Sequence, residues 1–282
     1  MSDPDEVAAI YDDLLATYEL EWRRRDNRSM HLGCYDEDHQ EPAEAAVNTM
    51  RLLSEAAAVQ ADERVLALGC GAGEDTAWLA RARGATVVGV DIATPLLERA
   101  RENAREQGVA DRVTFVQDDF QELASVADDS MDLVWGLEAL SHSPDRPAAL
   151  DQARRVLVAD GRVAFADIFL REPTDDDRVG EVEAALGLQL GPIESFERGL
   201  AEAGFTRVTV RDRTDAVRPD TENRRQFARL AHPVGRLLGT VGLVSARQLD
   251  AFRASTLVAD LVDDGLLGYY LVTADRATDN LR

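Results

Sequence analysis

A short apolar run that ends in three closely spaced glycines, residues 65–73 with the sequence VLALGCGAG, constrains this chain more than any other stretch. The apolar run has the length of a buried strand, and helix-forming residues follow from Glu74 to Arg83. Glycines permit a tight turn and a close backbone approach to a ligand, because they carry no Cβ. The pattern predicts a strand, a turn and a helix that together bind a nucleotide-like ligand at the carboxyl end of a parallel strand.

A second apolar run, residues 86–91, ends in Asp91, which follows Gly69 by 22 residues. At about 20 residues, folds of this kind place the acid that binds the ribose hydroxyls. A dinucleotide fingerprint needs a small residue where this chain has Glu74. An anion there would repel a pyrophosphate at the N-terminus of the helix. The two acids therefore favour a ligand with an adenosyl group and no pyrophosphate.

Strand and helix patterns alternate through the middle of the chain. Alternation of this kind predicts a Rossmann-like, doubly wound α/β sheet that is mostly parallel, with helices on both faces. We predict strands at 63–68, 86–91, 113–117, 131–135 and 162–167, and helices at 74–83, 95–107 and 147–157.

Two flanking segments lie outside the alternating core, which we place at residues 61–213 and 265–282. Residues 1–60 are predicted to form an N-terminal helical cap, with helices at 7–19 and 44–58. Residues 214–264 separate the last two predicted strands, and fifty residues are too many for a plain loop. We therefore predict a helical insert there that forms a lid over the substrate.

The chain is strongly acidic, with a net charge of −22 from 53 acidic and 31 basic residues, and every basic residue is arginine. Nucleic-acid binding depends on neutralising phosphates, so this charge argues against a nucleic-acid partner. It disfavours an anionic membrane surface for the same reason. We expect a small-molecule partner; the composition does not indicate an oligomeric state.

An acidic, lysine-free composition favours a halophilic protein, whose self-repulsion is screened by salt. The alternative is an ordinary acidic protein from a GC-rich genome. Only two cysteines occur, Cys34 and Cys70, which suits a reducing cytoplasm. The sequence shows no signal-like segment and no apolar run long enough to span a membrane, and we predict a cytoplasmic protein.

The glycine motif has the form G-x-G-x-G, and with Asp91 it resembles the first motifs of the class I S-adenosylmethionine-dependent methyltransferases. The resemblance covers about residues 61–213. It implies an enzyme that uses S-adenosylmethionine, releases S-adenosylhomocysteine and completes its sheet with an antiparallel pair, here residues 205–211 and 267–273. It also implies the following cofactor-binding residues: Gly69, Cys70, Gly71, Gly73, Asp91, Ile92, Asp119, Phe120 and Leu137.

Two further stretches, residues 132–146 (DLVWGLEALSHSPDR) and 30–35 (MHLGCY), resemble small-molecule methyltransferases of the sarcosine/dimethylglycine, tocopherol and geranyl diphosphate type. One interpretation is an N-methyltransferase that makes the osmolyte betaine from glycine derivatives. The alternative is a C- or O-methyltransferase for an isoprenoid or quinone-like molecule. A non-catalytic regulatory protein that binds the cofactor is the rival of a different class.

Methyl transfer from a sulfonium requires alignment and exclusion of water, and a general base only where the acceptor arrives protonated. By position, the candidates for that base are His142, Glu138 and His31. The aromatic residues Tyr35, Trp135 and Tyr269 are candidates for the substrate wall. No cysteine and histidine spacing indicates a metal site, so none is predicted.

Overall fold

The fold was analysed in a computed structural model, which describes residues 19, 22, 27–240 and 242–277. Residues 7–18, which carry most of the first predicted helix, lie outside the described residues. No helix in the described part is both long and apolar enough to cross a membrane.

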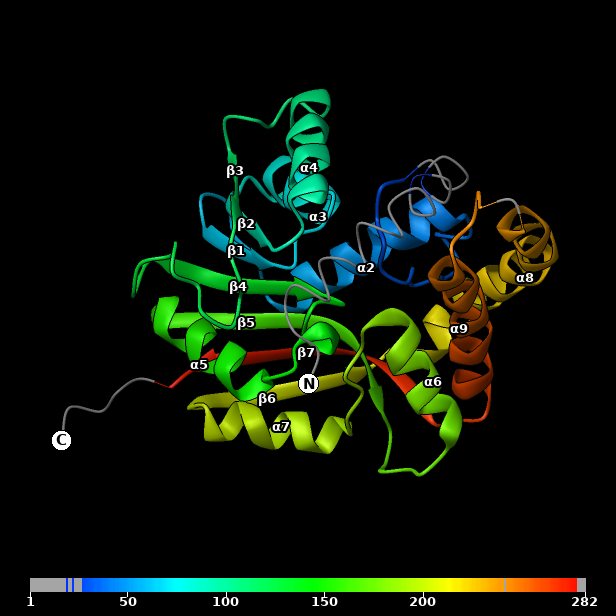
Figure 1. Ribbon diagram of the computed structural model, residues 1–282. Helices are drawn as coiled ribbons and strands as arrows, with labels where there is room; N and C mark the ends of the chain where they lie inside the picture. Colours follow the sequence, from blue (N-terminus) through cyan, green and yellow to red (C-terminus); the bar gives the residue numbers. More distant parts are fainter. Residues whose placement is uncertain (1–18, 20–21, 23–26, 241, 278–282) are drawn as a thin grey trace.

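A seven-stranded sheet in the order β3-β2-β1-β4-β5-β7-β6 forms the centre of the molecule (Figure 1). The first five strands pair in parallel, and β7 pairs antiparallel with both β5 and β6. The predicted Rossmann-like sheet with its antiparallel end is therefore confirmed. The strands are β1 (Arg64–Leu68), β2 (Thr86–Asp91), β3 (Val113–Gln117), β4 (Met131–Leu137), β5 (Leu157–Leu170), β6 (Phe205–Asp212) and β7 (Leu267–Arg276).

Helices cover both faces of the sheet because successive strand residues point to opposite sides. In β1, Val65 and Ala67 belong to one apolar core, and Leu66 and Leu68 belong to the other. The first core includes α2 (Pro42–Ala56), α3 (Glu74–Trp78), the π-helical turn Leu79–Arg83 and α4 (Thr94–Glu106); the second includes α5 (Arg146–Val156) and α7 (Ile193–Glu202).

Three helices gather at one end of the sheet: α6 (Asp177–Leu186), α8 (Thr214–Gly239) and α9 (Ala246–Asp263) (Figure 1). The sequence pattern does not predict α6. The insert between β6 and β7 consists of α8 and α9, which pack against each other. Arg225 of α8 joins them through ion pairs of 2.9 Å to Asp260 and 2.9 Å to Asp263.

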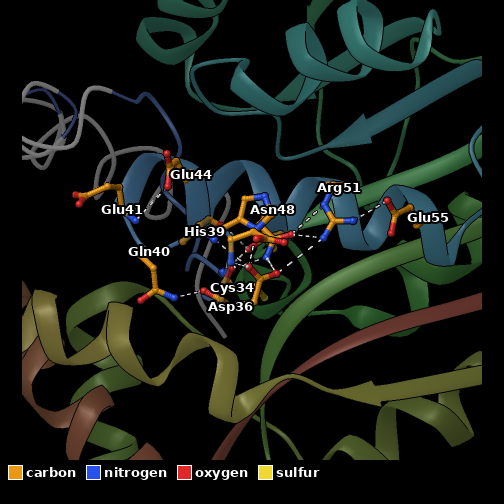
Figure 2. A network of polar contacts seen from close by, with 12 residues as sticks. Cys34, Asp36, His39, Gln40, Glu41, Glu44, Asn48, Arg51 and Glu55 are labelled. Carbon is orange, nitrogen blue, oxygen red and sulfur yellow. Dashed lines mark hydrogen bonds and ion pairs between the residues drawn. The ribbon is translucent and has the colours of Figure 1, made fainter.

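The segment before α2 is anchored to that helix by a polar network (Figure 2). Asn48 donates its side-chain amide to the Cys34 carbonyl at 2.8 Å and to the Asp36 carboxylate at 2.9 Å. Thr49 accepts from the Cys34 amide at 2.8 Å and donates to the Leu32 carbonyl at 2.9 Å. These bonds position the preceding residues, 29–32, over the carboxyl ends of the strands.

Candidate active site

A cavity of about 240 Å³ lies at the carboxyl ends of the parallel strands, which is where α/β sheets of this type bind ligands. Its floor comes from β1, β2, β4 and β5, and its other walls come from residues 29–32, α8 and α9. The lining residues that the pattern analysis also named are Gly69, Asp91, Ile92, Phe120, Leu137, Glu138, His142 and His31.

The turn after β1 requires glycine for two reasons. Gly69 has a φ of 57°, in the left-handed region, and a Cβ there would lie 2.9 Å from the Ala139 Cβ. The Asp91 carboxylate ties this turn to β2, because one oxygen accepts from the Gly71 amide at 2.8 Å and the other from the Ala93 amide at 2.9 Å. Burial raises the pKa of Asp91. The turn and the acid thus reach the cavity together.

Four residues predicted to contact the cofactor do not line the cavity. The Cys70 side chain points toward Gly89 of β2, and Gly73 packs against Ala100 and Phe115. Met30 covers Gly71, since its Cε would lie 2.7 Å from a Cβ at that position. The Asp119 carboxylate accepts from the Gln121 amide at 2.8 Å, so it caps the turn after β3.

Glu138 follows β4 directly and has a φ of 50°, a conformation that costs free energy for a residue other than glycine. Its amide donates to the Ala166 carbonyl at 2.7 Å, and its carboxylate accepts from the Leu32 amide at 2.6 Å. Burial raises the pKa of Glu138 to about 7, although the nearby Arg224 guanidinium opposes the shift. Strained backbone and a displaced pKa together make Glu138 a candidate for a functional side chain.

His142 lines the same cavity, and its Nδ1 lies 3.1 Å from the Gly187 carbonyl. A ring that donates from Nδ1 carries its lone pair on Nε2. Burial lowers the pKa of His142 to about 4, so the ring is neutral at physiological pH. His31 is buried, with its Nδ1 3.1 Å from the Leu32 carbonyl. Both rings line the cavity: His31 comes from the segment before α2, and His142 comes from the turn that follows β4.

Arg224 of α8 holds residues 29–32 in place, and the sequence pattern does not predict this role. Its Nη2 donates to the Met30 and His31 carbonyls at 2.9 Å each, and its Nε donates to the Asp220 carboxylate at 2.9 Å. Its tertiary contacts alone identify this arginine, because the sequence of α8 contains several arginines and does not distinguish one from another. The guanidinium is thus committed to protein groups.

The structure corrects the three predicted aromatic wall residues. Trp135 is fully buried in the core and does not line the cavity; its indole Nε1 donates to the Asp75 carboxylate at 3.0 Å. Tyr269 is buried in the same core as Trp135; it interacts with Glu138 but does not line the cavity. The Tyr35 hydroxyl accepts from the Asn223 amide at 3.1 Å, which ties residue 35 to α8.

Apolar side chains from the flanks form the wall in their place. Phe227 of α8 and Phe252 of α9 meet edge to face, with ring centroids 6.2 Å apart. No strand pattern could reveal this wall, because it comes from helices distant in the sequence. The apolar lining residues not predicted are Trp22, Met30, Leu32, Ala139, Ile168, Leu186, Leu188, Phe227, Ala228, Ala251, Phe252 and Val258.

The cavity fits an adenosyl ligand at the glycine turn. Gly69 leaves the turn open, Asp91 offers a carboxylate suited to a vicinal diol, and Phe120 and Leu137 supply apolar surface beside them. Among the described residues, no group of three or more histidine, cysteine or acidic side chains is placed to hold a metal ion.

Comparison with known proteins agrees with this geometry. A family model described as a methyltransferase domain matches residues 66–165. The chain is 38% identical over 181 residues to methyltransferase GfsG of Streptomyces halstedii, which covers 63% of this chain and 65% of that protein. It is 32% identical over 222 residues to 27-O-demethylrifamycin SV methyltransferase of Amycolatopsis mediterranei (strain S699), covering 77% and 79% respectively. With sarcosine/dimethylglycine N-methyltransferase of Halorhodospira halochloris it shares 27% identity over 239 residues, covering 84% and 82%.

Solved structures share the fold. Geranyl diphosphate methyltransferase in complex with geranyl diphosphate and sinefungin superposes with a TM-score of 0.79 at 19% identity, covering 97% of this chain and 99% of that one. A second structure of that enzyme holds S-adenosylmethionine and superposes with a TM-score of 0.72. The chain therefore belongs to the class I S-adenosylmethionine-dependent methyltransferases of small molecules, and S-adenosylmethionine is its cofactor.

Proposed function

We propose that this protein transfers a methyl group to a hydroxyl oxygen of a largely apolar small molecule, with Glu138 as the general base. The observation that carries the proposal is a mostly apolar cavity in which one buried carboxylate has its pKa raised to about 7. Among the alternatives predicted from the sequence, this is the O-methyltransferase.

The walls of the cavity support an apolar acceptor. Beyond the glycine turn, the surface comes mainly from Leu186, Leu188, Phe227, Phe252 and Val258. Apolar pockets with a few placed polar groups bind apolar ligands and use the polar groups to orient them. A hydroxyl group on an otherwise apolar molecule fits such a cavity.

The same cavity argues against glycine derivatives, which carry a carboxylate. Among the described residues that line it, Arg224 is the only arginine, and its guanidinium already binds two carbonyls and Asp220. Asp91 and Glu138 add negative charge to the wall. Apart from the cofactor's own charge, a substrate carboxylate would meet no cation beyond Arg224 among these described lining residues, and burying it beside two acids would be costly. The betaine hypothesis is therefore the weaker of the two.

Bound S-adenosylmethionine supplies an electrophilic methyl group on a sulfonium. The protein must then accept the hydroxyl proton and exclude water. A base with a pKa near the working pH is the most effective, and Glu138 meets that condition. The reacting hydroxyl gives its only proton to Glu138, so His142, neutral and with its lone pair on Nε2, orients the acceptor by accepting a hydrogen bond from a second donor group of that molecule. Residues 29–32 close the cavity above them.

The curated relatives give independent support. One relative above 30% identity is named for O-methylation of a rifamycin, and another, at 32% identity over 177 residues, for 3''-O-methylation of erythromycin in Saccharopolyspora erythraea. The N-methyltransferase of Halorhodospira halochloris is less similar, at 27%.

A transfer assay with labelled S-adenosylmethionine tests the proposal. The panel contains apolar alcohols and phenols, an isoprenoid alcohol, sarcosine and dimethylglycine, each with the wild type and with Glu138→Gln. We expect label on the hydroxyl compounds and its loss in the variant. Transfer to sarcosine alone would support the betaine hypothesis instead, and cofactor binding without any transfer across a broad panel would favour a regulatory protein.

A further inference from the structure

The tip of the helical insert carries an unusual apolar surface. Among the described residues, all the large apolar side chains that are strongly exposed lie between residues 230 and 243. Their exposed fractions are 77% for Leu230, 58% for Val234, 70% for Leu237, 37% for Leu238 and 72% for Leu243. Exposed apolar side chains gathered in one place mark a binding surface more often than scattered ones do.

Four of these residues lie on the same helix face as a residue that lines the cavity, although none of the four lines it. Leu230, Val234, Leu237 and Leu238 follow Phe227 at spacings of three, seven, ten and eleven residues, which places all five on one face of α8. Phe227 lines the cavity. We call Leu230, Val234, Leu237 and Leu238 the α8 stripe. From Phe227 to Leu238 the helix rises about 16 Å, so the stripe leads from the cavity to the outer end of the insert.

The neighbouring helix, α9, supplies apolar side chains where the α8 stripe begins beside the cavity. Phe252 of α9 stands edge to face with Phe227, and Ala251 and Val258 also line the cavity. Gly235 lets the two helices approach closely, because a Cβ there would lie 3.0 Å from Leu249 and 3.7 Å from Phe252. The two phenylalanines therefore stand where the cavity meets the stripe.

The charge of this segment differs from that of the rest of the chain. Residues 223–249 contain five arginines and no acidic residue, in a protein with a net charge of −22. The rest of the chain contains 53 acidic residues and 26 arginines, and charged side chains of this kind hold water. A tip without them, and with exposed leucines, is suited to contact an apolar ligand.

We propose that the acceptor carries a long apolar tail and that the α8 stripe binds this tail. This inference rests on the proposed O-methylation and names its substrate class: a hydroxyl group at one end of a flexible alkyl or isoprenoid chain. The hydroxyl lies at Glu138, the chain passes Phe227 and Phe252, and the tail lies along the stripe. The cofactor takes up part of the cavity. The tail of a long acceptor must therefore leave the cavity, and the path past Phe227 and Phe252 is an apolar way out.

Calorimetry with the full chain and S-adenosylhomocysteine present tests the proposal, with 4-ethyl-, 4-butyl-, 4-hexyl- and 4-octylphenol as probes. Each methylene buried on the route tightens binding by about fourfold. We expect affinity to rise through octylphenol in the wild type. The double variant Leu230→Gln and Leu237→Gln should weaken octylphenol binding by at least tenfold and leave ethylphenol unchanged.

Leu243→Gln is the matched control, since Leu243 is equally exposed on the same tip but lies beyond the end of α8. It should bind all four phenols as the wild type does. An affinity that stops rising at butylphenol, with no effect of the double variant, overturns the proposal. So does a dimer in sedimentation that the double variant dissociates, because the stripe then belongs to a second copy.

The two proposals fail separately. Tail-dependent binding without methyl transfer to any of the phenols contradicts the proposed hydroxyl acceptor and leaves the stripe standing. Methyl transfer that is indifferent to tail length, with binding equally indifferent, contradicts the stripe and supports the hydroxyl acceptor.

Discussion

Replacing Glu138 by glutamine should abolish the pH dependence of methyl transfer together with most of its rate. Glutamine keeps an oxygen that accepts from the Leu32 amide, so the contact that holds residues 29–32 survives. What the variant loses is a group that takes a proton. Loss of a general base lowers kcat by roughly 10²- to 10⁴-fold.

The pKa of the Glu138 carboxyl sets the shape of the wild-type pH profile of kcat/KM. A base works only when it is deprotonated, and burial places the pKa of Glu138 at about 7. Its ionised fraction is then about one tenth at pH 6 and about nine tenths at pH 8. We therefore expect kcat/KM to fall about tenfold as the pH falls from 8 to 6.

His142 provides the discriminating comparison. Its pKa is lowered to about 4, so its protonation barely changes between pH 6 and pH 8. With an alcohol acceptor that does not titrate in this range, a flat wild-type profile would refute the assignment of Glu138. The variant His142→Gln should keep the slope and lower the rate, whereas a slope lost in this variant and kept in Glu138→Gln would reverse the two roles.

Three further predictions concern cofactor binding and stability. Asp91→Ala should weaken binding of S-adenosylhomocysteine by more than about 1.5 kcal/mol, because charge-assisted hydrogen bonds are lost; calorimetry on the folded variant that shows unchanged affinity would remove Asp91 from the site. Burial raises the pKa of Asp75 to about 7, so its contribution to the free energy of unfolding is present at low pH and lost as the pH rises through about 7. Asp75→Asn should flatten the fall of Tm between about pH 4 and pH 7, and an unchanged slope would contradict this. Tm should also rise from low salt to molar potassium chloride, since repulsion from the net charge of −22 is screened within about 3 Å at 1 M; a flat or falling Tm would argue against halophilic adaptation.

Much of the sheet follows from local pattern. Residues 86–91 and 113–117 form strands with the predicted bounds, because an apolar run between turn residues has few other stable states. The glycine turn was predictable as well, since a left-handed φ at Gly69 leaves little choice of residue. Asp91 reaches the cavity because a strand of fixed length ends there.

The local sequence pattern predicts the bounds of a strand less well where pairing with a distant strand sets them. β5 extends to Leu157–Leu170, well beyond the predicted 162–167, because residues 168–170 pair with β7, which is distant in sequence, and Leu157 pairs with Met131 of β4. The helix α6 was missed, since its short amphipathic pattern is weak. Trp135 and Tyr269 were predicted to line the pocket, but both side chains point into the core.

The sequence alone determined the fold and the place of Asp91, because these depend on spacing along the chain and on backbone geometry, and the resemblance of its glycine motif indicated the cofactor. The acceptor side of the site was decided by tertiary structure. Arg224 meets the carbonyls of residues 30 and 31, and Phe227 meets Phe252, only after distant segments have packed together. The raised pKa of Glu138 is likewise a consequence of burial, which is a property of the folded chain and of no single segment.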